Sequence, residues 1–203
     1  MNFRLPASLN VTVPLILLAF AAILSAVNLL YHVPKAERAA EDTGRERLAQ
    51  EMSRLQSTLE YLLLKGDFTI AQHEIEVLAH DHDVILAALT NERQQVVAAT
   101  KRAWLGRSVA EVLPQFDLDQ AAGAIRERRA EVTTDANADV LLGYAGVLIG
   151  GEREELRPYR TGTLFLAYDL RRYKTEARAQ VLQQSYYWAG WVTALALGMW
   201  LVF

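Results

Sequence analysis

The chain has 203 residues, of which 52% are hydrophobic, and a formal net charge of -3 at pH 7. This length fits one domain of ordinary size with attachments, and the small negative charge, without a basic stripe, excludes the usual nucleic-acid-binding surface. The sequence contains no cysteine, which excludes a disulfide framework, thiolate catalysis and cysteine-based zinc sites.

Two uncharged stretches near the chain ends predict transmembrane helices. After a tail at 1–10, residues 11–31 contain no charged side chain, and about 20 apolar residues suffice to cross a bilayer. A cleaved signal peptide is the alternative, but its apolar region would be only about 7–15 residues long. Residues 185–203 are also uncharged, and aromatic residues cluster at their start as at a membrane interface. A buried core helix is the alternative for this second stretch.

The second stretch runs to Phe203 without a polar flank. We therefore expect the sequence to be the front part of a longer protein, with an output domain after it. Basic residues are more frequent on the side of the intervening region, which would place that region inside the cell. Loops longer than about 60 residues, however, cross the membrane largely regardless of their charge.

A long charged helix is predicted at 35–65. Its apolar residues recur at alternating spacings of four and three, a seam of about two heptads, formed by Leu48, Met52, Leu55, Leu59 and Leu62. This stripe can pack on the sheet of its own domain or against a second copy of the chain. We expect the upper part to be covered by the sheet, and Leu48, Met52 and Leu55 to form a homodimer contact.

The next segments predict a hairpin followed by a short helix. A helix capped by Asp67 or Thr69 runs to about His80, and residues 83–100 form two apolar runs around a polar turn, as in paired antiparallel strands. Ser108 precedes Glu111 at the capping-box spacing of a short helix. The remaining elements are a helix within 116–129, strands at 130–134, 140–150 and 163–169, and a charged exit helix at 170–184.

This order predicts an α+β domain at 36–184, and it resembles the extracytoplasmic PAS-like sensor domains called Cache or PDC domains. Three segments carry the resemblance: the hairpin at 83–100, the phrase Leu105-Gly-Arg-Ser-Val109 with its helix, and the closing strand within 162–170. The two predicted transmembrane helices strengthen it. The second half departs from the family because it is short and has no clear ligand-binding signature.

The resemblance implies a PAS-like antiparallel sheet with a long N-terminal helix, flanked by two transmembrane helices. It implies the sensory input region of a bacterial inner-membrane receptor, with the domain in the periplasm or outside the cell. Such a receptor would bind a small molecule, work as a homodimer, and signal through the second transmembrane helix. The output would be a histidine kinase, a diguanylate cyclase or a phosphodiesterase.

The position of the pocket in PAS-like sheets suggests four ligand-binding residues. Trp104, Tyr144 and Tyr168 would supply aromatic walls, and Arg107 a cation for a small carboxylate. The alternative is that the three aromatic residues belong to the core or to the surface of the sheet.

No motif for enzymatic turnover or for a resident cofactor stands out. A different function would use His73, His80 and His82, with neighbouring aspartates, as metal ligands of a membrane-tethered metal-binding protein or enzyme. Such runs more often solvate the end of a helix. A membrane scaffold that only dimerises is a third hypothesis.

Overall fold

The computed structural model describes residues 9–135, 139–150 and 159–202. The chain divides into two compact units: one contains the two ends, up to Glu41 and from Tyr173 onward, and the other contains Asp42–Arg172. The second unit, called the sheet unit below, holds every strand in the described part of the chain.

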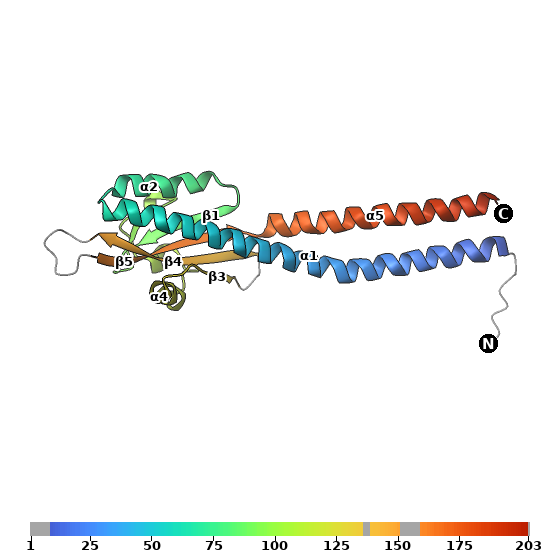
Figure 1. Cartoon of the computed structure of the whole chain (residues 1–203), viewed down its shortest axis with the longest axis horizontal. Coiled ribbons are helices and arrows are strands. Elements are labelled where there is room, and N and C mark those ends of the chain that lie inside the picture. The colour runs from blue at the N-terminus through green and yellow to red at the C-terminus, as the bar shows by residue number, and fades with distance from the viewer. Residues whose placement is uncertain (1–8, 136–138, 151–158, 203) are drawn as a thin grey trace. The chain divides into compact units, whose positions relative to one another are not determined.

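Five antiparallel strands form one sheet in the order β2-β1-β5-β4-β3 (Figure 1). The strands are β1 (Val84–Thr90), β2 (Val96–Ala99), β3 (Glu131–Thr134), β4 (Val140–Gly150) and β5 (Tyr159–Asp169). β5 lies at the centre and pairs with β4 over its whole length. The prediction of strands at 83–100 and at 140–150 is confirmed, whereas β5 begins four residues before the predicted strand at 163–169.

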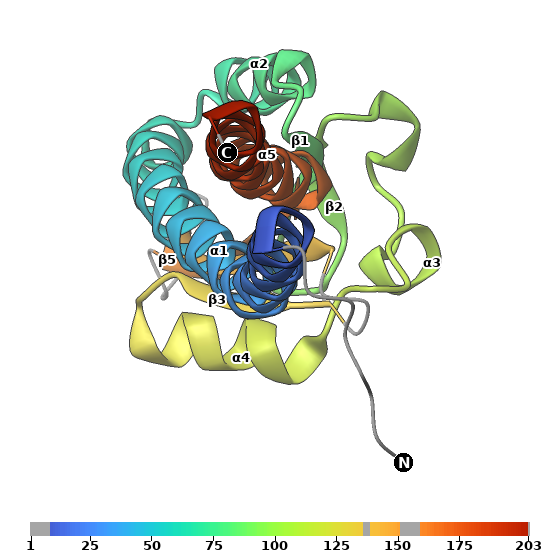
Figure 2. The same cartoon turned by 90° about the vertical axis from the view of Figure 1, so that its right-hand side faces the viewer.

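Helices cover both faces of this sheet. The helices in the described part of the chain are α1 (Leu9–Leu64), α2 (Phe68–Val77), α3 (Val109–Val112), α4 (Leu118–Glu127) and α5 (Arg171–Val202), with short 3-10 turns η1 (Leu78–His80) and η2 (Arg102–Trp104). The last part of α1 and α2 lie on one face, called the α1 face, and α4 lies on the other, called the α4 face (Figures 1 and 2). The α+β class is confirmed, and a long N-terminal helix on a five-stranded antiparallel sheet fits the PAS-like fold.

Side chains alternate between the two faces along β4, as the period of two in a strand requires. Leu142 and Tyr144 belong to the core on the α4 face, together with Ala121 and Ala124 of α4. The intervening Gly143 faces α1, where a Cβ would lie 3.2 Å from Met52 Cγ. The sheet is therefore buried on both sides.

The stripe along α1 packs on the sheet of its own chain. Leu48, Met52 and Leu55 are 1%, 0% and 3% exposed, and Leu59 and Leu63 are buried with them. The prediction that the first three form a homodimer contact is therefore corrected, because one chain already covers them. Dimerisation itself stays a prediction and needs another surface.

Side chains of the helices on the α1 face cover both edges of the sheet. β4 extends past its pairing with β3, and there Gln56 of α1 donates to the carbonyl of Gly146 (2.7 Å) while Glu60 accepts from the amide of Leu148 (3.2 Å). At the opposite edge, the amide of Gln72 in α2 donates to and accepts from the backbone of Ala99, both at 2.9 Å. Exposed edges invite pairing with other chains, and these contacts satisfy backbone groups at both edges.

The predicted transmembrane stretch at 11–31 lies within the range of α1, and that at 185–203 lies within α5 up to Val202, while Phe203 is outside the described residues. Over the part of the chain that the structure describes, no helix has a run both long and apolar enough to cross a membrane. In the unit formed by the chain ends, Arg178 of α5 makes an ion pair with Glu37 of α1.

Candidate functional site

The four residues predicted to bind a ligand do not lie together. In the register of β4 and β5, Tyr144 pairs with Phe165 and Leu141 pairs with Tyr168. Directly paired residues point to the same face of a sheet and successive residues to opposite faces. Tyr144 therefore lies on the α4 face and Tyr168 on the α1 face, so one pocket cannot use both rings.

Tyr144 is part of a filled aromatic core. Its ring centroid lies 5.1 Å from that of Phe165 and 5.6 Å from that of Phe116. The phenol oxygen accepts from the amide of Asp117 (3.1 Å), and the side chain is 0% exposed. Burial is the main cause that raises the pKa of the Tyr144 phenol above its usual value. These contacts show that Tyr144 is packed into the core of the domain.

The other three predicted residues occupy separate positions. Trp104 is half-buried and packs against the core of the α4 face. Arg107 is exposed and forms an ion pair with Glu111, with 3.5 Å between the charged groups. Tyr168 donates a hydrogen bond to Asp83 (3.2 Å). Ligand binding by these residues stays a prediction that this arrangement does not favour.

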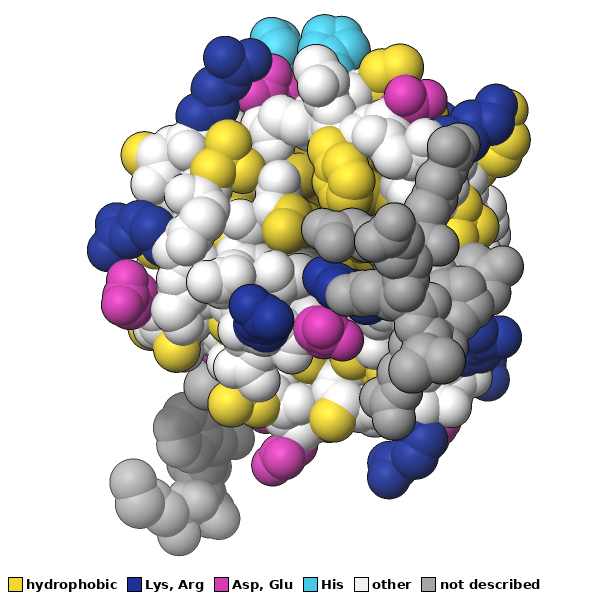
Figure 3. All heavy atoms as spheres, turned by 90° about the vertical axis from the view of Figure 1, so that its left-hand side faces the viewer, with side chains coloured by type: hydrophobic (Ala, Val, Ile, Leu, Met, Phe, Trp, Pro, Cys, Tyr) yellow, Lys and Arg dark blue, Asp and Glu magenta, His cyan; other side chains and the backbone are white. Residues whose placement is uncertain are grey.

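The histidine cluster does not assemble into a metal centre. His73, His80 and His82 are exposed, and histidine side chains lie at the surface in Figure 3. Among the residues described by the structure, no three His, Cys, Asp or Glu side chains are grouped so that they could hold a metal ion.

A cavity of about 550 Å³ lies at the end of the sheet unit, where α1 turns into α2. It is bounded by that connection, by the turn between β1 and β2, and by the adjoining ends of β4 and β5. We call it the end cavity. Hydrophobic, basic and acidic side chains lie side by side on this end of the unit (Figure 3).

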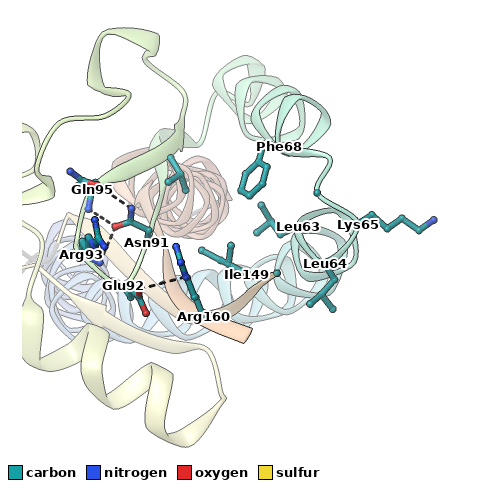
Figure 4. Close-up of a pocket in the computed structure, with 13 residues that line it drawn as sticks. Leu63, Leu64, Lys65, Phe68, Asn91, Glu92, Arg93, Gln95, Ile149 and Arg160 are labelled. Carbon is teal, nitrogen blue, oxygen red and sulfur yellow. Dashed lines mark hydrogen bonds and ion pairs between the residues drawn. The ribbon is translucent and has the colours of Figure 1, made fainter. Parts of the chain in front are cut away.

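One side of the end cavity is apolar. Leu63 of α1 and Ile149 of β4 are buried, at 1% and 6% exposure, whereas Phe68 at the start of α2 is 46% exposed. Figure 4 shows these three side chains around one space, with Phe68 directed toward Leu63. Val97 of β2 lines the same cavity.

The other side of the end cavity carries charge. Arg160 of β5 lies opposite Ile149 in the strand register and is 3.8 Å from Glu92, measured from Nε to Oε1 (Figure 4). This distance is longer than a hydrogen bond. Lys65 extends away from the cavity and contacts Tyr61.

Two turns, each with one residue in the left-handed conformation, Gly66 and Gln94, position this site. Gly66 has φ 81°, and the amide of Asp67 donates to the carbonyl of Leu62 while that of Gly66 donates to Leu63. This is the Schellman pattern that ends a helix, and it fixes the entry to α2. In the other turn, the side chain of Asn91 accepts from the amides of Arg93 and Gln95, both at 2.9 Å.

The sequence signals for these turns were visible, but the end cavity was missed. The end of the long helix near residue 65 and the polar turn within 83–100 were both predicted and are confirmed. The cavity depends on residues far apart in the chain that meet only in the folded sheet.

The comparisons with known proteins add a structural likeness. No protein-family model and no curated protein matches the sequence. Among solved structures, the chain is similar to the crystal structure of the E. coli DcuS sensor domain, with 16% sequence identity and a TM-score of 0.42, over 66% of this chain and 96% of that one.

Proposed function

We propose that the chain is the sensory input region of a bacterial signalling receptor. The sheet unit binds a small molecule, and α5 carries the response to an output domain, either a histidine kinase or an enzyme of cyclic-di-GMP metabolism. The observation that supports this proposal is the junction between the sheet and α5. β5, the central strand, ends at Asp169 and α5 begins at Arg171, so that Leu170 alone connects them.

The junction is held firmly by the sheet unit. The amide of Leu170 donates to the carbonyl of Asp139 (2.8 Å), and Arg171 makes an ion pair with the same residue, 3.5 Å between Nε and Oδ2. Leu170 is 0% exposed, and a Cβ on Gly44 of α1 would lie 2.7 Å from its Cδ2. Because the first residues of α5 are tied to the sheet, a shift of β5 would move them with it.

The proposal includes a membrane, on the basis of the uncharged stretches at 11–31 and 185–203. The sheet unit would lie in the periplasm or outside the cell. Because the chain has no cysteine, a single Cys at the exposed Ser57 can be labelled selectively. We expect an impermeant maleimide to label it in cells with a permeable outer membrane, and the protein to resist alkaline extraction. Alkaline release, or labelling only after lysis, would contradict this part of the proposal.

Signalling through α5 can be tested by changing its helical phase. In a fusion of the chain to a histidine-kinase output region, one Ala inserted after Gln183 turns the following helix by about 100°, and seven Ala turn it by about -20°. We expect the insertion of one Ala to change basal kinase activity and the insertion of seven Ala to preserve it. Equal activity in both fusions would show that α5 does not transmit its orientation.

A further inference from the structure

We propose that a cavity between α1 and α5 binds the phosphate headgroup of an anionic phospholipid, with Lys35 as its counter-charge. The cavity has about 500 Å³ and is lined by four residues of α1 and three of α5. It lies within the unit formed by the chain ends, and we call it the helix-pair cavity. The inference rests on the proposed function, because it takes the two uncharged stretches to lie in a membrane.

Small side chains leave this space between the helices. His32, Ala36 and Ala39 are four and three residues apart on α1, so they share one face of the helix. Gln184 and Trp188 are four residues apart on α5 and line the cavity from the other side. Because two of the facing positions on α1 are alanine, the helices do not fill the space between them. Its volume falls within the range of about 300–1,000 Å³ that is typical of small-molecule sites.

The polar lining of the helix-pair cavity favours an anion. Lys35 carries a positive charge, and His32 and Gln184 add N–H donors. None of the described residues that line the cavity is acidic, and Lys35 makes no hydrogen bond or ion pair with another side chain that the structure describes. Glu37 of α1 is engaged by Arg178 of α5. Since the whole chain has a net charge of -3, the preference for an anion is a local property of this cavity.

The position of the cavity along the helices selects a lipid as the source of the anion. His32 directly follows the uncharged stretch at 11–31, and Gln184 directly precedes the one at 185–203. Trp188, on the second stretch, is 63% exposed, and tryptophan favours the headgroup level of a membrane. Basic pockets between transmembrane helices bind acidic lipid headgroups. A phospholipid can place its phosphate beside Lys35 and its acyl chains along the adjoining apolar stretches.

The test is native mass spectrometry of the full chain in a neutral detergent. The chain is titrated with phosphatidylglycerol or with zwitterionic phosphatidylcholine of the same acyl chains. We expect the first phosphatidylglycerol to bind at least tenfold more tightly than the first phosphatidylcholine. Glycerol 3-phosphate, a phosphate without acyl chains, should not compete at the same concentrations. Equal binding of the two lipids would overturn the inference, and competition by glycerol 3-phosphate would overturn the choice of a lipid.

The role of Lys35 is tested against a second cation on the same helix. Lys35→Gln should weaken binding of phosphatidylglycerol at least fivefold, whereas Lys35→Arg keeps the charge and should change the affinity less than twofold. Arg38→Gln makes the same change in net charge at an exposed position outside the lining, and it should also change the affinity less than twofold. Equal losses in Lys35→Gln and Arg38→Gln would reveal general attraction to basic residues and overturn the cavity as the site.

Filling the cavity is a test that leaves the charge unchanged. Ala36→Leu enlarges a lining side chain and should weaken binding at least fivefold. Ala179→Leu, at an exposed position of α5 outside the lining, is the matched control and should change the affinity less than twofold. Equal affinities in the two variants would move the lipid away from the cavity. A dimer in the same spectra that Ala36→Leu dissociates, together with unselective lipid binding, would show that a second copy covers the cavity and would overturn the inference.

The lipid site and the membrane placement fail separately, because lipid binding is measured in detergent. A chain that resists alkaline extraction but binds the two lipids equally rejects the helix-pair cavity alone. A chain that alkali releases, and that still selects phosphatidylglycerol in detergent, rejects the membrane placement alone.

Discussion

The two faces of the sheet are filled in different ways. On the α4 face, aromatic rings interlock and the backbone of α4 touches β4 at Gly146. On the α1 face, a stripe of aliphatic side chains runs along α1 until Leu63. α1 ends at the next residue, Leu64, and the end cavity begins beside this end of the helix. Open space therefore lies where helical cover stops.

This difference in packing decides which face could admit another molecule. A tightly filled face resists insertion, because protein cores lose stability when side chains are displaced. A cavity between an incomplete helical cover and two turns can accept a ligand without that loss. The same sheet thus combines a tightly packed core on one face with a cavity at the end of the other.

The largest effect is expected on the α4 face. Phe165→Ala removes a fully buried ring at the centre of the aromatic core, which typically costs about 3–5 kcal/mol. Denaturant unfolding of the full chain in detergent would measure this loss, with Phe165→Leu as a milder control. A loss below about 1 kcal/mol would mean that this face is loosely packed, and the contrast between the faces would disappear.

The next effect concerns the stripe on α1. Met52→Ala should cost about 2–5 kcal/mol, because Met52 is 0% exposed within one chain. The control is Arg54→Ala, whose side chain is 70% exposed. The loss should not depend on protein concentration. A destabilisation that vanishes on dilution would restore Met52 as a contact between two copies.

Local patterns predicted most of the strands, but they could not assign the partners of each face. The run at 140–150 gave the bounds of β4 because apolar strands flanked by turn residues are a local signal. The stripe on α1 was equally clear, yet its partner was assigned wrongly. A heptad spacing does not say whether a sheet or a second helix covers it. Near the end of the helix the buried residue is Leu63, four positions after Leu59, and not the predicted Leu62. An α-helix has 3.6 residues per turn, so either spacing, three or four, keeps a side chain on the face that packs on the sheet.

The candidate site was harder to predict because it depends on register. Nothing local places Tyr144 and Tyr168 on opposite faces; their strand pairing does. The end cavity likewise joins Leu63, Glu92 and Arg160, which lie far apart in the sequence. The pairing of β5 with both β4 and β1, together with the turn at the end of α1, brings them together.

A smaller effect is expected at the turn beside the end cavity. Gly66 has φ 81° and a Cβ there would meet nothing within 4 Å, so Gly66→Ala tests backbone strain alone, at about 1–2 kcal/mol. Gly106 has φ 77° and equal space, which makes Gly106→Ala a matched control of similar cost. Denaturant unfolding of the full chain in detergent would measure the two losses. Unchanged stability in the Gly66 variant would contradict the strain expected at its positive φ.

The smallest effect is expected from a surface ion pair between α2 and η2. Because α2 covers part of the α1 face, this pair also helps to hold that cover in place. Glu76 accepts from Arg102, with Nη2 to Oε2 at 3.0 Å, and from Gln72 at 2.8 Å. The hydrogen bond from Arg102, followed by that from Gln72, lowers the pKa of Glu76 from 4.5 to about 2. A carboxylate whose pKa is lower in the folded state stabilises the fold above its unfolded pKa and loses that contribution as pH falls through the folded pKa.

The difference in melting temperature between the wild-type chain and Glu76→Gln should therefore be constant above about pH 5. It should shrink from pH 4.5 toward pH 2, the interval between the two pKa values. Arg102→Gln should flatten the same part of the profile, because it removes the main donor to Glu76. Arg102 is 76% exposed, so added salt should reduce the difference. If the difference persists unchanged at pH 2, or if Arg102→Gln retains the wild-type profile, the pair does not secure α2, and the cover of the α1 face relies on its apolar contacts alone.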